Sequence, residues 1–183
     1  MPIAKLAELE TYCEVQGSGE PIVLAPASWW PSVTWSVGVV PFLSKRFKII
    51  TFDCRGTGRS SQLKDGYTVT QFAQDCIALL AHLGIARCHA VGFALGGQIM
   101  QAMAIARPDL VATLTIAASG AGTKTLAGGQ RSLSPDTERE IGAIGFDRYI
   151  RNYIENDTMA FSPKFYREHG EVVAALADAV WSG

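Results

Sequence analysis

The segment 91–97, Val-Gly-Phe-Ala-Leu-Gly-Gly, holds the residues of this chain best suited to organise a reaction. Gly92, Gly96 and Gly97 flank one central position, as in the nucleophile elbow, a sharp turn between a strand and a helix. In that motif a central serine attacks an acyl carbon, and backbone N–H groups stabilise the oxyanion. Here the central residue is Ala94, which has no oxygen and forms no acyl intermediate. The pattern therefore predicts an acyl-transfer site without its nucleophile.

The composition favours one soluble globular domain. The 183 residues are 48% hydrophobic and 18% charged, with a net charge of −1 and no basic block, which argues against a nucleic-acid partner. The amino terminus lacks a long apolar core and no apolar run reaches membrane-spanning length, so we expect a cytoplasmic protein without a membrane partner. Four cysteines lie apart, without a CxxC pair or a histidine cluster, which favours reduced thiols over a metal site or disulfides. We expect no cofactor.

The elements that would position this site alternate between strands and helices. Short apolar runs bounded by glycine or proline predict strands, and apolar residues at helical spacing predict helices. The predicted strands are 9–15, 22–25, 47–52, the run that enters the elbow from Cys88, and 111–117; the predicted helices are 32–43, 70–83 and 98–107. This alternation predicts an α/β fold with a mostly parallel sheet covered by helices on both faces.

Three features occur together in an order that resembles a known family. The elbow is preceded by Asp-x-Arg-Gly-x-Gly-x-Ser at 53–60, after an apolar strand, and its helix ends at Arg-Pro-Asp, 107–109, before the next strand. In this order the first two-thirds of the chain resembles the amino-terminal half of an α/β-hydrolase-fold protein. The resemblance implies a core over 1–120 with the first six strands of that fold, incomplete at its carboxy-terminal side. It also implies a loop and a helical lid segment over 121–183.

The resemblance also locates the groups that would bind an oxyanion. After the strand that ends at Leu24 the family has His-Gly, whereas this chain has Pro-Ala at 26–27. The loop donor would be the N–H of Ser28, or that of Trp29 if the loop is shifted by one residue. The second donor would be the N–H of Leu95, the residue after the elbow position.

A substrate pocket is expected near these donors. Trp29, Trp30 and Phe93 would line it, although core packing explains the two tryptophans equally well. Asp53 and Arg55 could contact substrate, but a structural ion pair in the turn is the stronger interpretation of these two residues. The ligand would be a small molecule with an apolar part.

The acid and the base of a triad are missing from their expected places. The family orders nucleophile, acid and histidine, with the histidine in a loop after the last strand. His82 and His89 precede the elbow, and His169 lies in a segment predicted to be helical. Helices are predicted at 136–143, 146–156 and 163–180, which the resemblance places in the lid. We therefore expect the acid and the histidine beyond Gly183, unless this is a shortened member of the family.

The strand 111–117 would lie at an open edge of the sheet. Unpaired N–H and C=O groups on an apolar edge strand recruit a partner. We therefore expect the chain either to form a homodimer or to be completed by a missing carboxy-terminal segment.

These residues support two functional hypotheses. In the first, the chain is an acyl hydrolase for an ester or lactone, and Ala94 replaces a native serine; the intact glycines favour this hypothesis. In the second, it is a natural non-hydrolytic member that binds a small molecule, in a receptor-like role, or uses the fold for chemistry without a nucleophile. The Pro-Ala pair at 26–27 favours the second hypothesis.

Overall fold

The chain divides into two compact units, residues 1–121 and residues 122–182. The computed structural model describes residues 3–28, 30–36, 38–120, 135–145, 148–149, 152, 163–171 and 173–174. The first unit contains the sheet and the elbow, and the second contains helices α4 and α6. The lid role expected for 121–183 stays a prediction.

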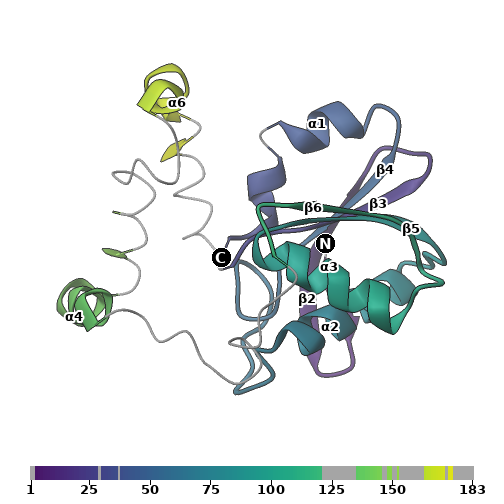
Figure 1. Ribbon diagram of the computed structural model, residues 1–183, viewed down its shortest axis with the longest axis horizontal. Helices are drawn as coiled ribbons and strands as arrows, with labels where there is room; N and C mark the ends of the chain where they lie inside the picture. Colours follow the sequence, from purple (N-terminus) through teal and green to yellow (C-terminus); the bar gives the residue numbers. More distant parts are fainter. Residues whose placement is uncertain are drawn as a thin grey trace. The chain divides into compact units, whose positions relative to one another are not determined.

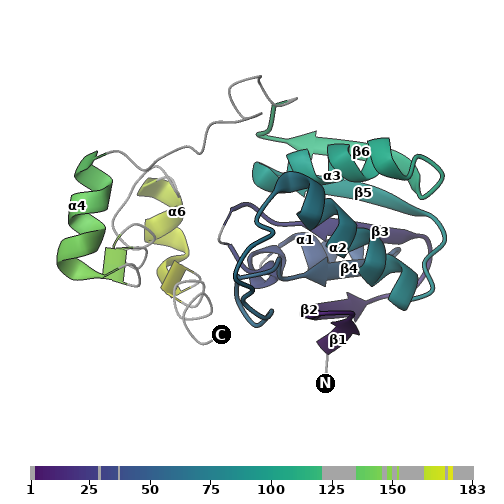
Figure 2. The same ribbon diagram turned by 90° about the horizontal axis from the view of Figure 1, so that it is seen from below.

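A six-stranded sheet forms the first unit, in the order β1-β2-β4-β3-β5-β6 (Figures 1 and 2). Its strands are β1 (Ile3–Leu6), β2 (Leu9–Gln16), β3 (Pro21–Ala25), β4 (Lys48–Phe52), β5 (Cys88–Phe93) and β6 (Val111–Ala117). β3 pairs in parallel with β4 and β5, and β5 pairs in parallel with β6, whereas β2 is antiparallel to β1 and β4. The predicted mostly parallel sheet is confirmed, and β1 is a strand that the sequence pattern did not locate.

Helices cover both faces of this sheet. They are η1 (Ser32–Trp35, a 3₁₀ helix), α1 (Val39–Leu43), α2 (Val69–His82) and α3 (Leu95–Ala106). Val23 and Ile50 belong to the cluster beneath α2 and α3, whereas their neighbours Leu24 and Ile49 belong to the cluster that includes α1. Because successive strand residues face opposite sides, α1 and the α2–α3 pair lie on opposite faces (Figure 1). The predicted fold class is confirmed.

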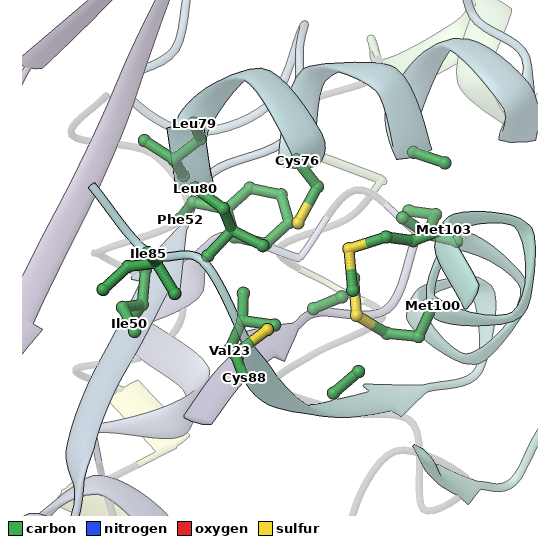
Figure 3. Packing of buried hydrophobic residues seen from close by; sticks show 14 of the residues in the cluster. Val23, Ile50, Phe52, Cys76, Leu79, Leu80, Ile85, Cys88, Met100 and Met103 are labelled. Atoms are coloured by element: carbon green, nitrogen blue, oxygen red, sulfur yellow. The ribbon is translucent and has the colours of Figure 1, made fainter. Parts of the chain in front are cut away.

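The larger core cluster lies between the sheet and helices α2 and α3. Cys76, Leu79, Leu80, Met100 and Met103 are completely buried there. Figure 3 shows the sulfur atoms of Cys76, Met100 and Met103 pointing into the same interior space. Unbranched methionine side chains fill irregular gaps of this kind, so Met100 and Met103 have a packing role.

Local sequence signals determine both ends of helix α2. The side chain of Thr68 caps its amino terminus by accepting a hydrogen bond from the N–H of Gln71 at 3.1 Å. Gly84, with φ of +68°, follows its carboxyl end, where glycine tolerates the left-handed backbone. The predicted helix 70–83 agrees with the structure within one residue at each end.

The predicted single helix over 32–43 is wrong. The structure has η1 and α1 instead, with Gly38 as the N-cap of α1 at φ −171° and ψ −44°. That φ is far from helical, and glycine in a helix interior costs about 1 kcal/mol relative to alanine. The apolar spacing across this segment was therefore not enough to keep it in one helix.

β6 lies at the edge of the sheet opposite β1 (Figure 2). Among the described strands it pairs only with β5, and its residues 113–117 are exposed. Leu114 and Ile116 keep 38% and 40% of their surface exposed. The open edge expected from the sequence is therefore present in this unit, while the nature of any partner stays a prediction.

The second unit contains helices where the sequence predicts them. α4 (Pro135–Ile144) confirms the helix expected at 136–143, and α6 (Pro163–Glu168) confirms the start of the helix expected at 163–180. Residues 175–180 and most of the helix predicted at 146–156 lie outside the described residues.

Candidate active site

Ala94 occupies the turn between β5 and α3 with a strained backbone. Its φ of +50° and ψ of −115° lie in a region that non-glycine residues rarely adopt. Its N–H donates to the carbonyl oxygen of Ala117 at 3.0 Å, and its own carbonyl accepts from the N–H of Gly97 at 3.0 Å. Helix α3 begins at Leu95, directly after the turn, and not at Gln98 as predicted. The local geometry is that of an elbow.

Each glycine of the elbow lies where a side chain would meet another backbone or side chain. A Cβ on Gly92 would overlap the carbonyl oxygen of Gly96, and a Cβ on Gly96 would overlap the carbonyl oxygen of Ala25. A Cβ on Gly97 would lie 2.5 Å from the Cβ of Ser119. The first turn of α3 therefore packs against the ends of both β3 and β6, which is the close approach that the glycine spacing predicts.

The loop 26–31 connects β3 to η1 and begins beside the elbow, because Ala25 pairs in register with β5. Ser28, the predicted loop donor, is half-buried, as is Trp30. The N–H of Trp30 donates to the carbonyl oxygen of Ala27 at 3.3 Å, which forms a turn around Ser28. Trp29, predicted as an alternative donor and as a pocket residue, lies outside the described residues.

Leu95 is placed to supply the other donor. It is the first residue of α3, so no carbonyl four residues earlier lies in the helix to accept its N–H. The positive end of a helix dipole at this point favours an anion. Phe93, the last residue of β5, is 44% exposed. The roles of Leu95 in oxyanion binding and of Phe93 in substrate binding stay predictions.

Asp53 follows β4 and is completely buried. Its Oδ1 accepts from the backbone N–H of Ser32 at 2.6 Å, and its Oδ2 accepts from the backbone N–H of Arg59 at 2.9 Å. The Nε atom of Arg59 lies 3.6 Å from Oδ2. The hydroxyl of Ser60 donates to the Asp53 carbonyl at 2.7 Å. This residue therefore ties the loop after β3 to the turn after β4.

Arg55 pairs with a different carboxylate from the one that the turn sequence suggests. Its Nε and one terminal nitrogen each lie 2.6 Å from the carboxylate of Asp75 in α2. The two side chains are 2% and 13% exposed. The hydrogen bonds to Asp75 raise the pKa of Arg55 above its ordinary value. The ion pair of Arg55 with Asp75 therefore connects the turn after β4 to α2, which is a structural role.

The three histidines have different surroundings. His82 is the last residue of α2 and is exposed. His89, in β5, has its Nδ1 2.8 Å from the Thr113 hydroxyl and its Nε2 3.3 Å from a Glu20 carboxylate oxygen. In the second unit, the ring of His169 lies 4.8 Å from that of Phe165. Chain order remains the argument against His82 and His89 as a triad base, whereas the argument against His169 is its place directly after helix α6 and not after a strand.

A surface hollow of about 320 Å³ lies away from the elbow. Its lining residues are Phe42, Leu43, Lys45, Arg46 and Phe47. They precede β4, at the amino ends of the parallel strands, whereas the elbow follows the carboxyl end of β5. The hollow is therefore separate from the candidate active site.

The four cysteines are free and buried. Burial raises the pKa of the Cys54 thiol to about 12 and that of Cys88 to about 11. Burial, and then the neighbouring thiols, raise the pKa of Cys76 well above its ordinary value. Such thiols are protonated at neutral pH and therefore poor nucleophiles.

Within the described part of the chain, no three His, Cys, Asp or Glu side chains form a group that could hold a metal ion. No described helix is long and apolar enough to cross a bilayer.

Comparison with known proteins agrees with this geometry. The profile of the alpha/beta hydrolase fold matches residues 25–160. The chain belongs to the α/β-hydrolase fold family. This match includes the loop 26–31, the turn after β4 and the elbow, so the family resemblance carried by those residues is confirmed.

Relatives of this α/β-hydrolase fold chain include hydrolases. The protein of Azorhizobium caulinodans named "Putative carbamate hydrolase RutD" is 33% identical over 116 residues, which are 63% of this chain and 43% of that protein. The N-acyl homoserine lactone degrading enzyme Est816 superposes with a TM-score of 0.74 at 25% identity, over 97% of this chain and 64% of that one.

A further solved structure supports the fold alone. The enol-lactonase of Burkholderia xenovorans LB400 superposes with a TM-score of 0.80 at 23% identity, over 98% of this chain and 67% of that one. The chain spans less than half the length of the curated relatives it matches.

Proposed function

We propose that this chain carries the elbow and the oxyanion donors of an acyl hydrolase for an ester or lactone with an apolar part. In this proposal Ala94 stands at the nucleophile position, so the polypeptide as written forms no acyl-enzyme. The supporting observation is the backbone of Ala94, whose φ of +50° and ψ of −115° together lie in a region that alanine rarely adopts, directly at the start of α3. Strain of about 1–3 kcal/mol of this kind persists where it serves a site.

The chemistry of the relatives agrees with this substrate class. The names of two relatives, "Putative carbamate hydrolase RutD" and the N-acyl homoserine lactone degrading enzyme, both point to reaction at a carbonyl carbon that bears a heteroatom. Hydrolysis at such a carbon passes through a tetrahedral oxyanion, which two backbone N–H groups stabilise. In the proposed site these groups belong to Leu95 and to Ser28 or Trp29, and Trp30 and Phe93 contact the apolar part. The second unit acts as the lid, and the protein functions in the cytoplasm.

Restoring a serine tests the proposal. In the full-length gene product, Ala94→Ser should hydrolyse p-nitrophenyl acetate and butyrate and become labelled by a fluorophosphonate, as followed by intact mass. Ala118→Ser is the matched control, because Ala118 also has a φ of +50°, just after β6, but is not the elbow residue. This control should behave like the wild type.

The relatives described above do not support the non-hydrolytic alternative. It would become the better conclusion if Ala94→Ser neither hydrolysed esters nor reacted with the fluorophosphonate while ligand binding was retained.

A further inference from the structure

The carboxylate of Asp53 serves two separate loops at once. Each of its oxygens accepts one backbone hydrogen bond, from Ser32 at 2.6 Å and from Arg59 at 2.9 Å, and its side chain is 0% exposed. A buried carboxylate is stable only when its oxygens have partners. Here main-chain donors provide them, so the position of each loop is linked to the position of this one side chain.

The loop 26–31 is fixed at both of its ends. At its start, Gly96 of α3 packs against the carbonyl oxygens of Ala25 and Pro26, since a Cβ on Gly96 would lie 2.6 Å from the latter. At its end, Ser32 is 2% exposed and is bound to Asp53. Between these two points lies Ser28, so the place of its N–H depends on both contacts.

We propose that Asp53 is a positioning residue whose carboxylate holds the loop 26–31 so that the loop's N–H donor faces the elbow. This inference rests on the proposed function, in which that loop supplies one oxyanion donor. A carboxylate suits the task because both of its oxygens accept and neither carries a hydrogen. In Asp53→Asn, the amide group would present its own N–H atoms to one of the two backbone donors and lose that contact.

Hydrogen exchange measures this contact directly. The full chain is compared as wild type, Asp53→Asn and Asp65→Asn by mass spectrometry, with peptides that cover 26–36 and β5. Asp65→Asn is the control, because it makes the same charge change in the same connection between β4 and α2 but at an exposed side chain. We expect Asp53→Asn to accelerate exchange in 26–36 about tenfold without changing β5, and Asp65→Asn to leave 26–36 at the wild-type rate. Unchanged exchange in Asp53→Asn, or equal acceleration in both variants, overturns the proposal.

Ser32→Pro breaks the same contact from the loop side, and it decides the question if Asp53→Asn does not fold. Proline removes the donor N–H, suits the first position of a helix, and follows Pro31, whose ψ of 162° is already extended. The bond from Arg59 to Asp53 is kept. The same acceleration in 26–36 is expected, and an unchanged rate contradicts the proposal.

Anion binding gives a readout that a purely structural role would not move. Phenylphosphonate is titrated into the wild type, Asp53→Asn and Asp65→Asn, because it presents a tetrahedral anion with an apolar group. Removal of a buried negative charge should by itself strengthen the binding of an anion, whereas displacement of the loop should weaken that binding. We expect about tenfold weaker binding in Asp53→Asn, and a change within about twofold in Asp65→Asn, because oxyanion donors are sensitive to geometry.

The two proposals fail in different ways. If phenylphosphonate does not bind the wild type at all, the proposed acyl-hydrolase site is wrong, and the exchange comparison still decides whether Asp53 holds the loop. If it binds wild type and Asp53→Asn equally, the site stands and the positioning role is wrong.

Discussion

At the scale of single residues, the elbow depends on backbone shape more than on side-chain chemistry. Ala94 keeps a positive φ, and the glycines at 92, 96 and 97 remove side chains that would meet other atoms. A serine at position 94 would need no new backbone geometry, because the turn is already formed. In the proposed site, the oxygen that Ala94 lacks is the local feature that separates this turn from a working elbow.

Gly96→Ala should be strongly destabilising. The added Cβ would overlap a backbone carbonyl of β3, which cannot move aside as a flexible side chain can. We expect the free energy of unfolding to fall by about 3 kcal/mol, or folding to fail. Gly38→Ala is the control, because a Cβ there meets nothing within 4 Å. Urea unfolding followed by circular dichroism checks both, and equal stability of the two variants would contradict the close packing at Gly96.

At the scale of elements, turns and helix ends carry the interactions that fix the site. Asp53 joins the turn after β4 to the loop after β3, and Arg55 joins the same turn to α2 through Asp75. A buried arginine deprived of its carboxylate is costly, so the turn and α2 are expected to unfold together. The site thus rests on two polar links as well as on apolar packing.

Thr68→Ala should shorten or weaken α2 at its amino terminus. The side-chain oxygen of Thr68 accepts from the N–H of Gln71, and alanine leaves that N–H without this partner. We expect a loss of about 1 kcal/mol in the free energy of unfolding. Thr70→Ala, inside the helix and exposed, should be neutral or slightly stabilising because alanine is the better helix former. Chemical denaturation of the two variants measures the difference, and a loss shared by both would argue against capping.

At the scale of the whole molecule, the first unit has an apolar core between sheet and helices and one exposed strand at its edge. The core contains Cys54, Cys76 and Cys88 as protonated thiols. The exposed strand, β6, has neither a charged residue nor a proline to discourage pairing. Stability and association are therefore expected to depend on different parts of the unit.

The buried thiols should make the fold sensitive to alkali. Unfolded thiols ionise near pH 9, whereas the raised pKa of Cys88, about 11, keeps it protonated in the folded state. The contribution of this thiol to the free energy of unfolding is constant below pH 9. As the pH rises from 9 towards 11, this contribution falls by about 1.4 kcal/mol per pH unit. Urea unfolding at pH 8, 9 and 10 should show a shallower loss for Cys88→Ala than for the wild type. Equal losses of unfolding free energy in Cys88→Ala and the wild type would exclude Cys88 as a cause of the alkaline destabilisation.

We propose that β6 takes a partner, either a second copy of the chain or further residues of the same polypeptide. Sedimentation velocity of the 183-residue chain should show concentration-dependent association. Thr115→Lys, which places a charge on the exposed strand, should reduce it, whereas Phe42→Lys, at an α1 residue that is 72% exposed, should not. A monodisperse monomer with cooperative unfolding at all concentrations would rule out self-association.

Much of the fold followed from the sequence by itself, because periodicity and backbone preference are local properties. The alternation of strands and helices predicted the α/β class, and the glycines at 92, 96 and 97 predicted the sharp turn around Ala94. The residue types alone also showed that Ala94 supplies no nucleophile. Helix α2 was predicted within one residue because its cap, its apolar face and its glycine stop are all nearby in the chain.

Only the tertiary structure decided which distant residues meet. It paired Arg55 with Asp75 and Asp53 with Ser32, across separations of 20 and 21 residues that no local pattern encodes. It also placed β1 beside β2 and divided the segment 32–43 at Gly38. The physical reason is that a buried charge selects its partner by position in space, and that position is set by the packing of the whole sheet. The sequence thus identified the elbow, and the fold determined what holds the loop beside it.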